Sequence, residues 1–345
     1  MRLRLASPSP KFIAAPPVRP AAVHISRRRY TCPAPRTPLR AGQLQRPRSD
    51  HPRAHNHNHR QPTAPREMAT TSTSALSATE QAALVEESKR AAAYEAVKEH
   101  MDLKYTHVGI GSGSTVVYVV EAIAALGPDA TARMAFFPTG EQSRELIRGA
   151  GLRLQYVQDL PEGQQLDVCF DGADEVDEEL NLIKGGGACL FQEKLIVTKA
   201  KKFVCVADFR KMSARLGTSW KKGIPIEVVY QATGHVLAEL KKLGSINPVL
   251  RSGLPGKAGS IVTDNGNSLI DAPFPPLALA KDLKGKDGEN GVWTVDGLAD
   301  KIIKIVGVVE VGLFAGANGF QVQSSAQKPV AAYFGMADGS VQSRK

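Results

Sequence analysis

The strongest constraint on the fold is an alternation of short apolar runs and helical stretches between residues 105 and 207. Apolar runs of strand length that alternate with helices are typical of parallel sheets, whose strands are buried on both faces. The sequence therefore predicts an α/β fold in which a mostly parallel sheet carries helices on both faces. The predicted strands are Tyr105–Ile110, Met134–Phe137, Arg153–Val157, Leu166–Phe170 and Phe203–Ala207, and the predicted helices are Val116–Leu126, Gly140–Gly149 and Leu190–Ala200.

The pattern changes beyond Gly217, where shorter elements and a proline-containing insertion at 272–292 appear. The Asn265-Gly266 step indicates a hairpin turn. We interpret 217–317 as a smaller α+β lid domain, and 80–216 plus 318–345 as a Rossmann-like main domain. A helix that starts at Ser77 and ends near His100 is predicted ahead of the first strand. The elements predicted for the lid are strands at Ile224–Tyr230, at two places within Ser260–Asp271 and at Val306–Phe314, and helices at Thr233–Leu243 and Val295–Ile305.

Residues 1–79 are predicted to form a disordered extension. Residues 1–67 hold fourteen Lys and Arg, two acidic residues and twelve of the 22 prolines, so this part carries a net charge of +12 and the rest of the chain −2. Such a segment buries too little apolar surface to order itself. It is interpreted as a tail, a mitochondrial transit peptide, or a stretch upstream of a start at Met68. The near-neutral remainder predicts no nucleic-acid partner, and a cytoplasmic location is expected.

Membrane, disulfide and metal sites are not expected from the sequence. No run reaches the length of about eighteen apolar residues that a membrane span requires. Cys169, Cys189 and Cys205 fall in apolar segments without metal-ligand spacing, which favours reduced thiols. The histidines at 55, 57 and 59 lie in the basic extension and are interpreted as solvated.

A glycine-rich turn, 111–115, follows the first predicted strand and leads into an apolar helix. Glycines let the backbone approach an anion, and the free amides and positive end of the helix point at it. The turn lacks the Lys of a Walker loop, and Ser114 stands where a dinucleotide-binding pattern has its third glycine. On this segment alone, a phosphate-binding turn and a turn without a ligand both stay open.

Two carboxylates, Asp171 and Asp174, follow the predicted strand 166–170. Ligands of α/β sheets bind at the carboxyl edge of the strands, and repulsion and burial raise the pKa of one acid of a pair toward neutrality. Such a pair suits proton transfer to sugar hydroxyls, although a plain acidic turn is the alternative. An EF-hand does not fit, because Gly172 follows the first Asp directly. The acids that come next are interpreted as a solvated face: Glu175, Asp177, Glu178 and Glu179.

A cation and three glycines, 184–187, precede a predicted helix that carries Glu193. A Lys beside flexible amides can hold an oxyanion or a phosphate. Glu193 is followed by the apolar run 195–197 and is predicted to face the buried side of its helix, where desolvation raises its basicity. Lys211 and Asp208 follow another strand at the same edge. The set fits proton abstraction next to the carbonyl of a phosphorylated sugar better than redox or hydrolytic chemistry, although a surface Glu and an exposed Lys are the alternatives.

These motifs resemble the ordered signature of the A-type ribose-5-phosphate isomerases. The likeness extends over nearly all of 80–345, although residues 315–330 follow the pattern loosely and their path stays open. The segments that carry it are Val108–Thr115, Asp171–Glu175, Lys184–Ala188, Gln192–Lys194, Val262–Asn267 and Gly307–Phe314. The stretch Trp220–Pro225 and the insertion at 272–292 are similar to fungal members.

The resemblance implies interconversion of D-ribose 5-phosphate and D-ribulose 5-phosphate through a cis-enediolate, in the non-oxidative pentose phosphate pathway. It implies that Glu193 is the general base, that Asp171 assists ring opening beside Asp174, and that Lys184 faces the developing oxyanion. It also implies a homodimer or homotetramer that needs no metal and no cofactor. The implied substrate-binding residues are Ser112, Gly113, Ser114, Thr115, Gly172, Ala173, Gly185, Gly186, Gly187 and Lys211.

Three other functions are weighed against this one. An acyl-CoA transferase on a related sheet would use a glutamate nucleophile, but it needs a roomy CoA groove. A non-enzymatic sugar-phosphate sensor needs a DNA-binding module ahead of the sheet, and 1–67 shows no helix-turn-helix pattern. Nucleic-acid binding through the tail would be strongly salt-dependent and would be lost on deletion of 1–67.

Overall fold

The computed structural model describes residues 77–345. The predicted extension therefore lies outside the described residues, apart from its last three positions. The first helix, α1 (Ala78–His100), begins with the predicted cap. Ser77 Oγ accepts from the Glu80 N–H at 3.3 Å, and the Ser77 N–H donates to the Glu80 carboxylate at 2.8 Å, so each side chain satisfies an amide that the helix leaves unpaired.

The described residues form helices and short strands in the order that the sequence predicts for the main elements. The other helices are α2 (Val116–Ala124), α3 (Pro128–Thr131), α4 (Glu141–Gly149), α5 (Leu190–Lys199), α6 (Thr233–Lys242) and α7 (Val295–Ile303). The strands are β1 (His107–Ile110), β2 (Ala135–Pro138), β3 (Val168–Asp171), β4 (Glu175–Val176), β5 (Leu182–Ile183), β6 (Phe203–Asp208), β7 (Ile224–Val228), β8 (Val249–Leu250), β9 (Ser268–Ala272), β10 (Val308–Val311), β11 (Leu313–Phe314), β12 (Ala331–Gly335) and β13 (Val341–Arg344).

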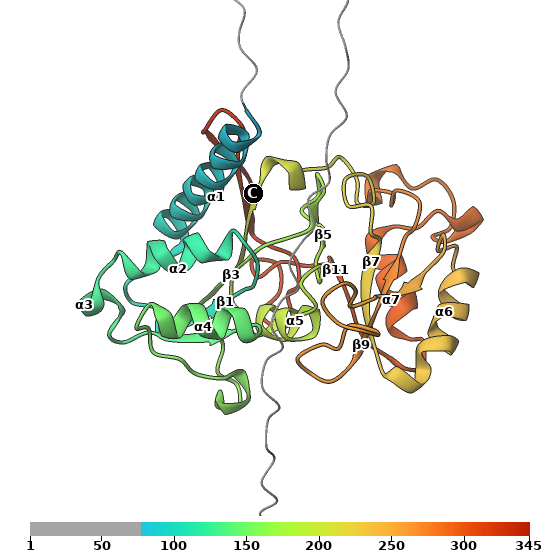
Figure 1. Cartoon of the computed structure of the whole chain (residues 1–345), viewed down its shortest axis with the longest axis horizontal. Coiled ribbons are helices and arrows are strands. Elements are labelled where there is room, and N and C mark those ends of the chain that lie inside the picture. The colour runs from blue at the N-terminus through green and yellow to red at the C-terminus, as the bar shows by residue number, and fades with distance from the viewer. Residues whose placement is uncertain (1–76) are drawn as a thin grey trace, which may run out of the picture. The chain divides into compact units, whose positions relative to one another are not determined.

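A six-stranded sheet in the order β13-β12-β6-β3-β1-β2 combines four strands from residues 107–208 with the last two strands of the chain. Its strands β1 and β3 are labelled in Figure 1. Strands β12, β6, β3, β1 and β2 run parallel, and only β13 pairs antiparallel, with β12. The mostly parallel sheet is confirmed. The last strands also return to this sheet, because β12 lies beside β6.

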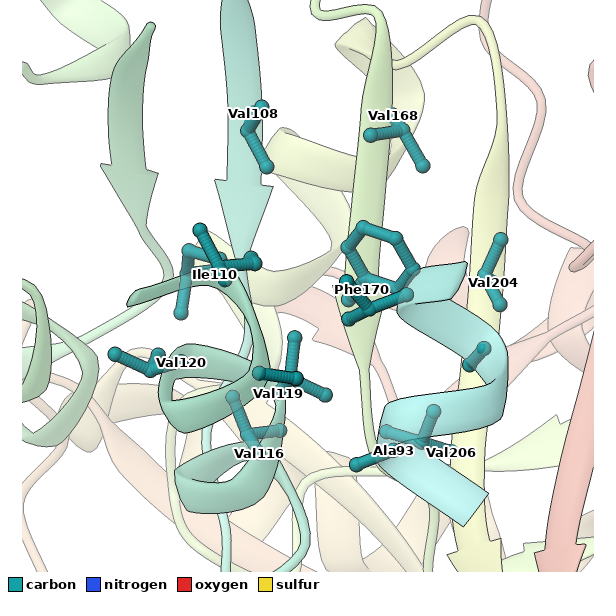
Figure 2. Close-up of a cluster of buried hydrophobic side chains, with 14 of the residues drawn as sticks. Ala93, Val108, Ile110, Val116, Val119, Val120, Val168, Phe170, Val204 and Val206 are labelled. Atoms are coloured by element: carbon teal, nitrogen blue, oxygen red, sulfur yellow. The ribbon is translucent and has the colours of Figure 1, made fainter. Parts of the chain in front are cut away.

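Side chains alternate between the two faces of this sheet, and helices cover both. Val108, Phe170 and Val206 point to the face covered by α1 and α2, as Figure 2 shows for their cluster. On the opposite face, Cys169 and Cys205 pack with the apolar side of α5. Burial of both faces explains why the strands read as nearly continuous apolar runs.

A second sheet, in the order β10-β7-β9-β8, is antiparallel throughout. Alternate residues of β7 (Ile224, Ile226 and Val228) join a core with α6 and α7. Glu227 lies between them in the sequence and points to the other face, against which α5 packs. All four strands lie within 217–317, but the division of the chain into a main domain and a lid stays a prediction.

The predicted strand Val306–Phe314 is divided between two sheets. Strand β10 belongs to the four-stranded sheet, and β11 pairs with β5 and β4 in a sheet of three strands. The break lies at Gly312, whose N–H donates to Pro225 O and whose carbonyl accepts from the Lys184 N–H at 2.9 Å. A Cβ at Gly312 would lie 2.3 Å from Lys184 O, so only glycine allows this crossing.

Two further strand predictions are wrong in part. Arg153–Val157 is not a strand: Leu154 forms only an isolated bridge with Phe136 at the β2 edge, and the chain then turns at Val157. Of the hairpin predicted in 260–271, the turn is present, because the Gly266 N–H donates to Thr263 O, but only β9 is regular. Its partner segment forms isolated bridges.

The acids after Asp174 are not all solvated, contrary to the prediction. Glu175 and Asp177 are fully buried. Glu175 accepts hydrogen bonds from the 213–219 loop, including the Ser219 N–H at 2.6 Å, and Asp177 accepts from Asn181 at 2.9 Å. Both carboxylates therefore organise loops of the backbone.

No helix of the described part of the chain is long and apolar enough to cross a membrane.

Candidate active site

Strands β1, β3 and β6 are neighbours in the parallel sheet, and their carboxyl ends meet at one edge. A cavity of about 220 Å³ lies there. Thirteen of the fourteen residues singled out in the sequence line it, and the fourteenth, Asp171, is fully buried next to it. The lining residues are Ser112, Gly113, Ser114, Thr115, Gln142, Gly172, Ala173, Asp174, Lys184, Gly185, Gly186, Gly187, Cys189, Glu193, Ala207, Asp208 and Lys211.

The turn between β1 and α2 brings amides to one end of the cavity. A Cβ at Gly111 would lie 2.0 Å from Asp171 Oδ1, so a glycine is required for this close approach. The Ser112 N–H donates to Asp171 Oδ1 at 3.1 Å. Among the described residues, no acceptor is paired with the amides of Ser114 and Thr115, which precede the N-terminus of α2. Free donors at the positive end of a helix suit an anion.

Lys184 lies at the centre of the site with 2% of its side chain exposed. Its Nζ is 2.6 Å from Gly172 O, 3.0 Å from Asp171 Oδ2 and 3.2 Å from Glu193 Oε1. Burial disfavours the charged ammonium, but the carboxylates of Asp171 and Glu193 outweigh it and raise the pKa of Lys184 above its ordinary value. Lys184 therefore stays charged between the two acids.

Glu193 has the strongest signature of a base in the cavity. It lies in the first turns of α5 and is 5% exposed, and its Oε2 has no hydrogen-bond partner among the described residues. Burial raises the pKa of Glu193 to about 8; Lys184 opposes this effect and Asp171 adds to it. Burial also raises the pKa of Asp171, against the attraction of Lys184. One buried ammonium facing two carboxylates leaves an excess negative charge that a proton relieves.

The segment after Lys184 and the segment after Asp171 are joined at the cavity wall. Asp174 Oδ2 accepts from the Gly186 N–H at 2.7 Å, and a Cβ at Gly186 would lie 2.5 Å from Asp174 Oδ1. The glycine loop can therefore lie directly on a carboxylate. Lys211, which follows β6, also lines the cavity, and its Nζ lies 5.4 Å from the ring centroid of Trp220.

Comparisons with known proteins agree with this geometry. The family model of ribose 5-phosphate isomerase A (phosphoriboisomerase A) matches residues 135–325. The ribose-5-phosphate isomerase of Eremothecium gossypii is 51% identical over 265 residues, which cover 75% of this chain and 92% of the relative. The chain belongs to the ribose 5-phosphate isomerase A family. The same-named protein of Mycosarcoma maydis is 49% identical over 78% of this chain and 85% of its own length.

Solved structures of the family share this fold. Ribose 5-phosphate isomerase A from Methanocaldococcus jannaschii superposes with a TM-score of 0.60 at 30% identity and covers 75% of this chain and 99% of its own. A D-ribose-5-phosphate isomerase in complex with phospho-erythronic acid superposes with a TM-score of 0.62 at 31% identity, with coverage of 76% and 99%. The Rossmann-like α/β class predicted from the sequence is therefore confirmed.

Sequence reasoning missed two lining residues with side chains in the cavity wall. Gln142 in α4 accepts from the Gly113 N–H at 2.8 Å and so supports the turn. Cys189 lies at the N-terminus of α5, and its sequence context indicates only a reduced thiol. Burial and the nearby Glu193 raise the pKa of the Cys189 thiol to about 12, so it is protonated and not a nucleophile at neutral pH. Neither residue belongs to a motif with its own chemical signal.

The described residues contain no group of three or more His, Cys, Asp or Glu side chains arranged to hold a metal ion. Metal independence stays a prediction.

Proposed function

We propose that this chain interconverts ribose 5-phosphate and ribulose 5-phosphate, with Glu193 as the base. The observation that carries the proposal is the buried ion triad, in which one Lys184 ammonium faces the carboxylates of Asp171 and Glu193 while Glu193 Oε2 stays unpaired beside the cavity. A base with a pKa near the working pH is effective in proton transfer.

The reaction follows from these positions. Glu193 takes the proton from C2 of the open-chain aldose, and the electron pair of the broken C–H bond moves to form C1=C2 while the carbonyl pair becomes a negative charge on O1. Lys184 faces that charge, which it stabilises within a buried site. A proton moves from O2 to O1, and Glu193 returns its proton to C1, leaving the carbonyl at C2. From the family likeness we assign hydroxyl protons and ring opening to Asp171 and Asp174, of which Asp174 lines the cavity and Asp171 is buried next to it.

The phosphate of the substrate is assigned to the other end of the cavity. The unpaired amides of Ser114 and Thr115 and the Lys211 ammonium lie around the same cavity as the triad. Anions bind well where amides and a cation converge at a helix N-terminus. We therefore assign the phosphate to these amides and Lys211, and the C1–C2 end of the substrate to Glu193.

The test is turnover of ribose 5-phosphate by purified 68–345 in EDTA, with Glu193→Gln measured alongside. We expect activity in the parent and a loss of kcat of roughly 10²–10⁴-fold in the variant, because proton transfer to a positioned base contributes about that much. Near-normal turnover by the variant would remove Glu193 from the role of base. Loss of parental activity in EDTA would contradict the metal-free reaction.

We propose, from the family likeness, that the chain is a homo-oligomer. Exposed apolar side chains at the ends of β7 and β10 support this: Val229, Tyr230 and Val306 are 42%, 65% and 79% exposed, and the Val229 N–H donates to Gly307 O. Light scattering of 68–345 should give the mass of a dimer or tetramer, and a monomer mass would refute the homo-oligomer.

A cytoplasmic location is likewise proposed, to be tested by imaging the tagged full chain.

A further inference from the structure

A partly buried arginine next to the four-stranded sheet reaches the glycine loop of the site. Arg251 follows β8, and Asp271 lies in β9. Arg251 Nε donates to Asp271 Oδ2 at 2.8 Å, and Arg251 Nη2 donates to Asp271 Oδ1 at 2.5 Å. The two side chains are only 14% and 11% exposed. A bidentate pair of this kind fixes the plane of the guanidinium, because two parallel hydrogen bonds to one carboxylate define its orientation.

The remaining nitrogen of this guanidinium binds two carbonyls of the loop. Arg251 Nη1 lies 3.0 Å from Gly185 O and 3.1 Å from Gly186 O. Arg251 does not line the cavity, whereas Gly185, Gly186 and Gly187 do. We infer that the glycine loop lies between the arginine and the cavity, and that the carbonyls of Gly185 and Gly186 turn away from the cavity.

Peptide geometry then determines where the amides of the loop point. In a planar trans peptide, the C=O and the following N–H point in opposite directions. The Gly186 N–H, opposite the Gly185 carbonyl that Arg251 binds, donates to Asp174 at 2.7 Å, and Asp174 lines the cavity. This pair shows that the side of the loop opposite Arg251 is the cavity side.

The same rule applies to the next peptide. Its carbonyl, Gly186 O, is held by Arg251, so the Gly187 N–H points to the cavity side. Among the described residues no acceptor is paired with this amide. A Cβ at Gly187 would meet no atom within 4 Å, so the loop is not packed against other atoms on its Cβ side at this position.

We propose that Arg251, held by Asp271, is a positioning residue that aims the Gly187 N–H at the enediolate oxygen facing Lys184. The inference rests on the proposed isomerase reaction and adds an orienting residue from the second sheet to it. A correctly aimed donor at a developing oxyanion contributes about 10²–10³ in kcat. Arg251 acts through the peptide and not on the substrate, so we expect its loss to cost roughly tenfold.

The test compares Arg251→Lys with the parent. Lysine keeps the positive charge but lacks the fork that binds Asp271 and both carbonyls together. We expect kcat to fall about tenfold with KM for ribose 5-phosphate changed less than about threefold, as for an interaction made in the transition state. The probe for the oxyanion is phospho-erythronic acid, whose carboxylate stands in for the enediolate oxygens. Its inhibition constant should rise by the same factor as kcat falls.

A second variant and a control separate this role from a structural one. Asp271→Asn leaves the Arg251 side chain unchanged but weakens the pair that orients it. We expect a smaller loss of kcat than in Arg251→Lys, with KM again changed little. Arg215→Lys changes another Arg–Asp pair, that of Arg215 with Asp282, whose side chains are 43% and 37% exposed, and should change neither kcat nor inhibition. A lower Tm with unchanged kcat would overturn the proposal.

Two other outcomes are also decisive. If Arg251→Lys weakens binding of inorganic phosphate and raises KM while kcat stays constant, the loop binds the phosphate and the proposal is wrong. Glu193→Gln is measured in parallel. If that variant turns over normally, the base assignment fails, yet the affinity for phospho-erythronic acid still decides whether Arg251 orients the anion site.

Discussion

Lys184 and Lys194 are both almost fully buried, and both lie beside the ring of Phe314, at 5.6 Å and 4.8 Å from its centroid. Lys184 faces two carboxylates and one carbonyl. Lys194 Nζ contacts one carboxylate, Glu310 at 2.8 Å, and the carbonyls of Val311 and Leu313 at 2.5 Å and 2.8 Å. Both ammonium groups therefore have three partners, but the charges around them differ.

The pKa values shift in opposite directions as a result. The pKa of Lys184 is raised because two carboxylates outweigh its burial. The pKa of Lys194 is lowered because burial outweighs the single carboxylate of Glu310. The first cluster has one carboxylate in excess and can hold a proton, whereas the second is electrically balanced. Burial of a charged group does not by itself indicate catalysis; an unbalanced charge beside a cavity is the more informative sign.

The largest expected effect sharpens this comparison at Lys184. Lys184→Met removes the cation that faces the oxyanion, and we expect kcat to fall by roughly 10²–10³-fold. It also removes the attraction that lowers the pKa of Glu193, so the acid limb of the pH–rate profile should move to higher pH. Initial rates from pH 6 to 10, with folding checked by circular dichroism, measure both effects. An unchanged limb would break the proposed coupling of the two residues.

At Lys194 we expect a loss of stability. Lys194→Met leaves Glu310 and two buried carbonyls without their donor, and breaking such a pair should reduce the free energy of unfolding by about 3 kcal/mol. The kcat of the folded protein should fall far less than in Lys184→Met. Denaturant unfolding and initial rates check this.

A double variant and a surface control complete the test at Lys194. Adding Glu310→Leu to Lys194→Met should recover part of the lost stability, because it removes the unpaired carboxylate while the carbonyls of Val311 and Leu313 stay without the lysine donor. The exposed pair of Lys242 with Glu239 is the control, and Lys242→Met should leave unfolding unchanged. A loss of kcat in Lys194→Met as large as that in Lys184→Met would contradict the distinction between the two lysines.

A smaller effect concerns the pH dependence of the parent protein. Because burial raises the pKa of Glu193 to about 8, the base is protonated at lower pH and cannot accept a proton from carbon. We expect kcat/KM to rise with pH up to a limb near pH 8 and to fall toward tenfold per unit below it. A limb near the ordinary value of 4.5 would show that Glu193 is solvated in solution.

The smallest effect is on stability. Since the pKa of Glu193 is raised on folding, its contribution to stability is fully present below its ordinary value of 4.5 and is lost as the pH rises through about 8. Glu193→Gln has no such loss. The Tm of Glu193→Gln minus the Tm of the parent should therefore increase between pH 5 and pH 9. A constant difference in Tm across this range would contradict the raised pKa.

The sequence predicted those segments of the site that come directly after a strand. The turn 111–115, the acids at 171 and 174 and the glycine loop after Lys184 each follow a strand, and parallel topology brings the ends of the strands together. The burial of Glu175 and Asp177 could not be predicted in this way. Their partners, such as Ser219 and Asn181, lie in loops whose conformation is set by tertiary contacts.

Partners distant in the sequence were missed for the same reason. Arg251 is 66 positions from Gly185, and nothing in the hydrophobic pattern around either residue indicates that they meet. The division of β10 from β11 depends on the close approach of Gly312 to Lys184 O. The hydrophobic periodicity of 306–314 does not indicate that contact. Motifs predict the groups that touch a ligand, whereas the residues that hold them come from pairings that only the folded chain reveals.

The bond between Lys194 and Glu310, which spans 116 positions, has a consequence for folding. It joins the helix of the proposed base to the edge strand β10 of the antiparallel sheet, late in the chain. Closing a loop of that length costs chain entropy before any contact compensates for it, and folding slows as contacts become less local. All cavity-lining residues lie within 112–211, so a chain that has not yet brought β10 to α5 holds the whole set without the contact that fixes the helix of the base. Recovery of turnover after dilution from denaturant should therefore follow this late closure and not the first collapse.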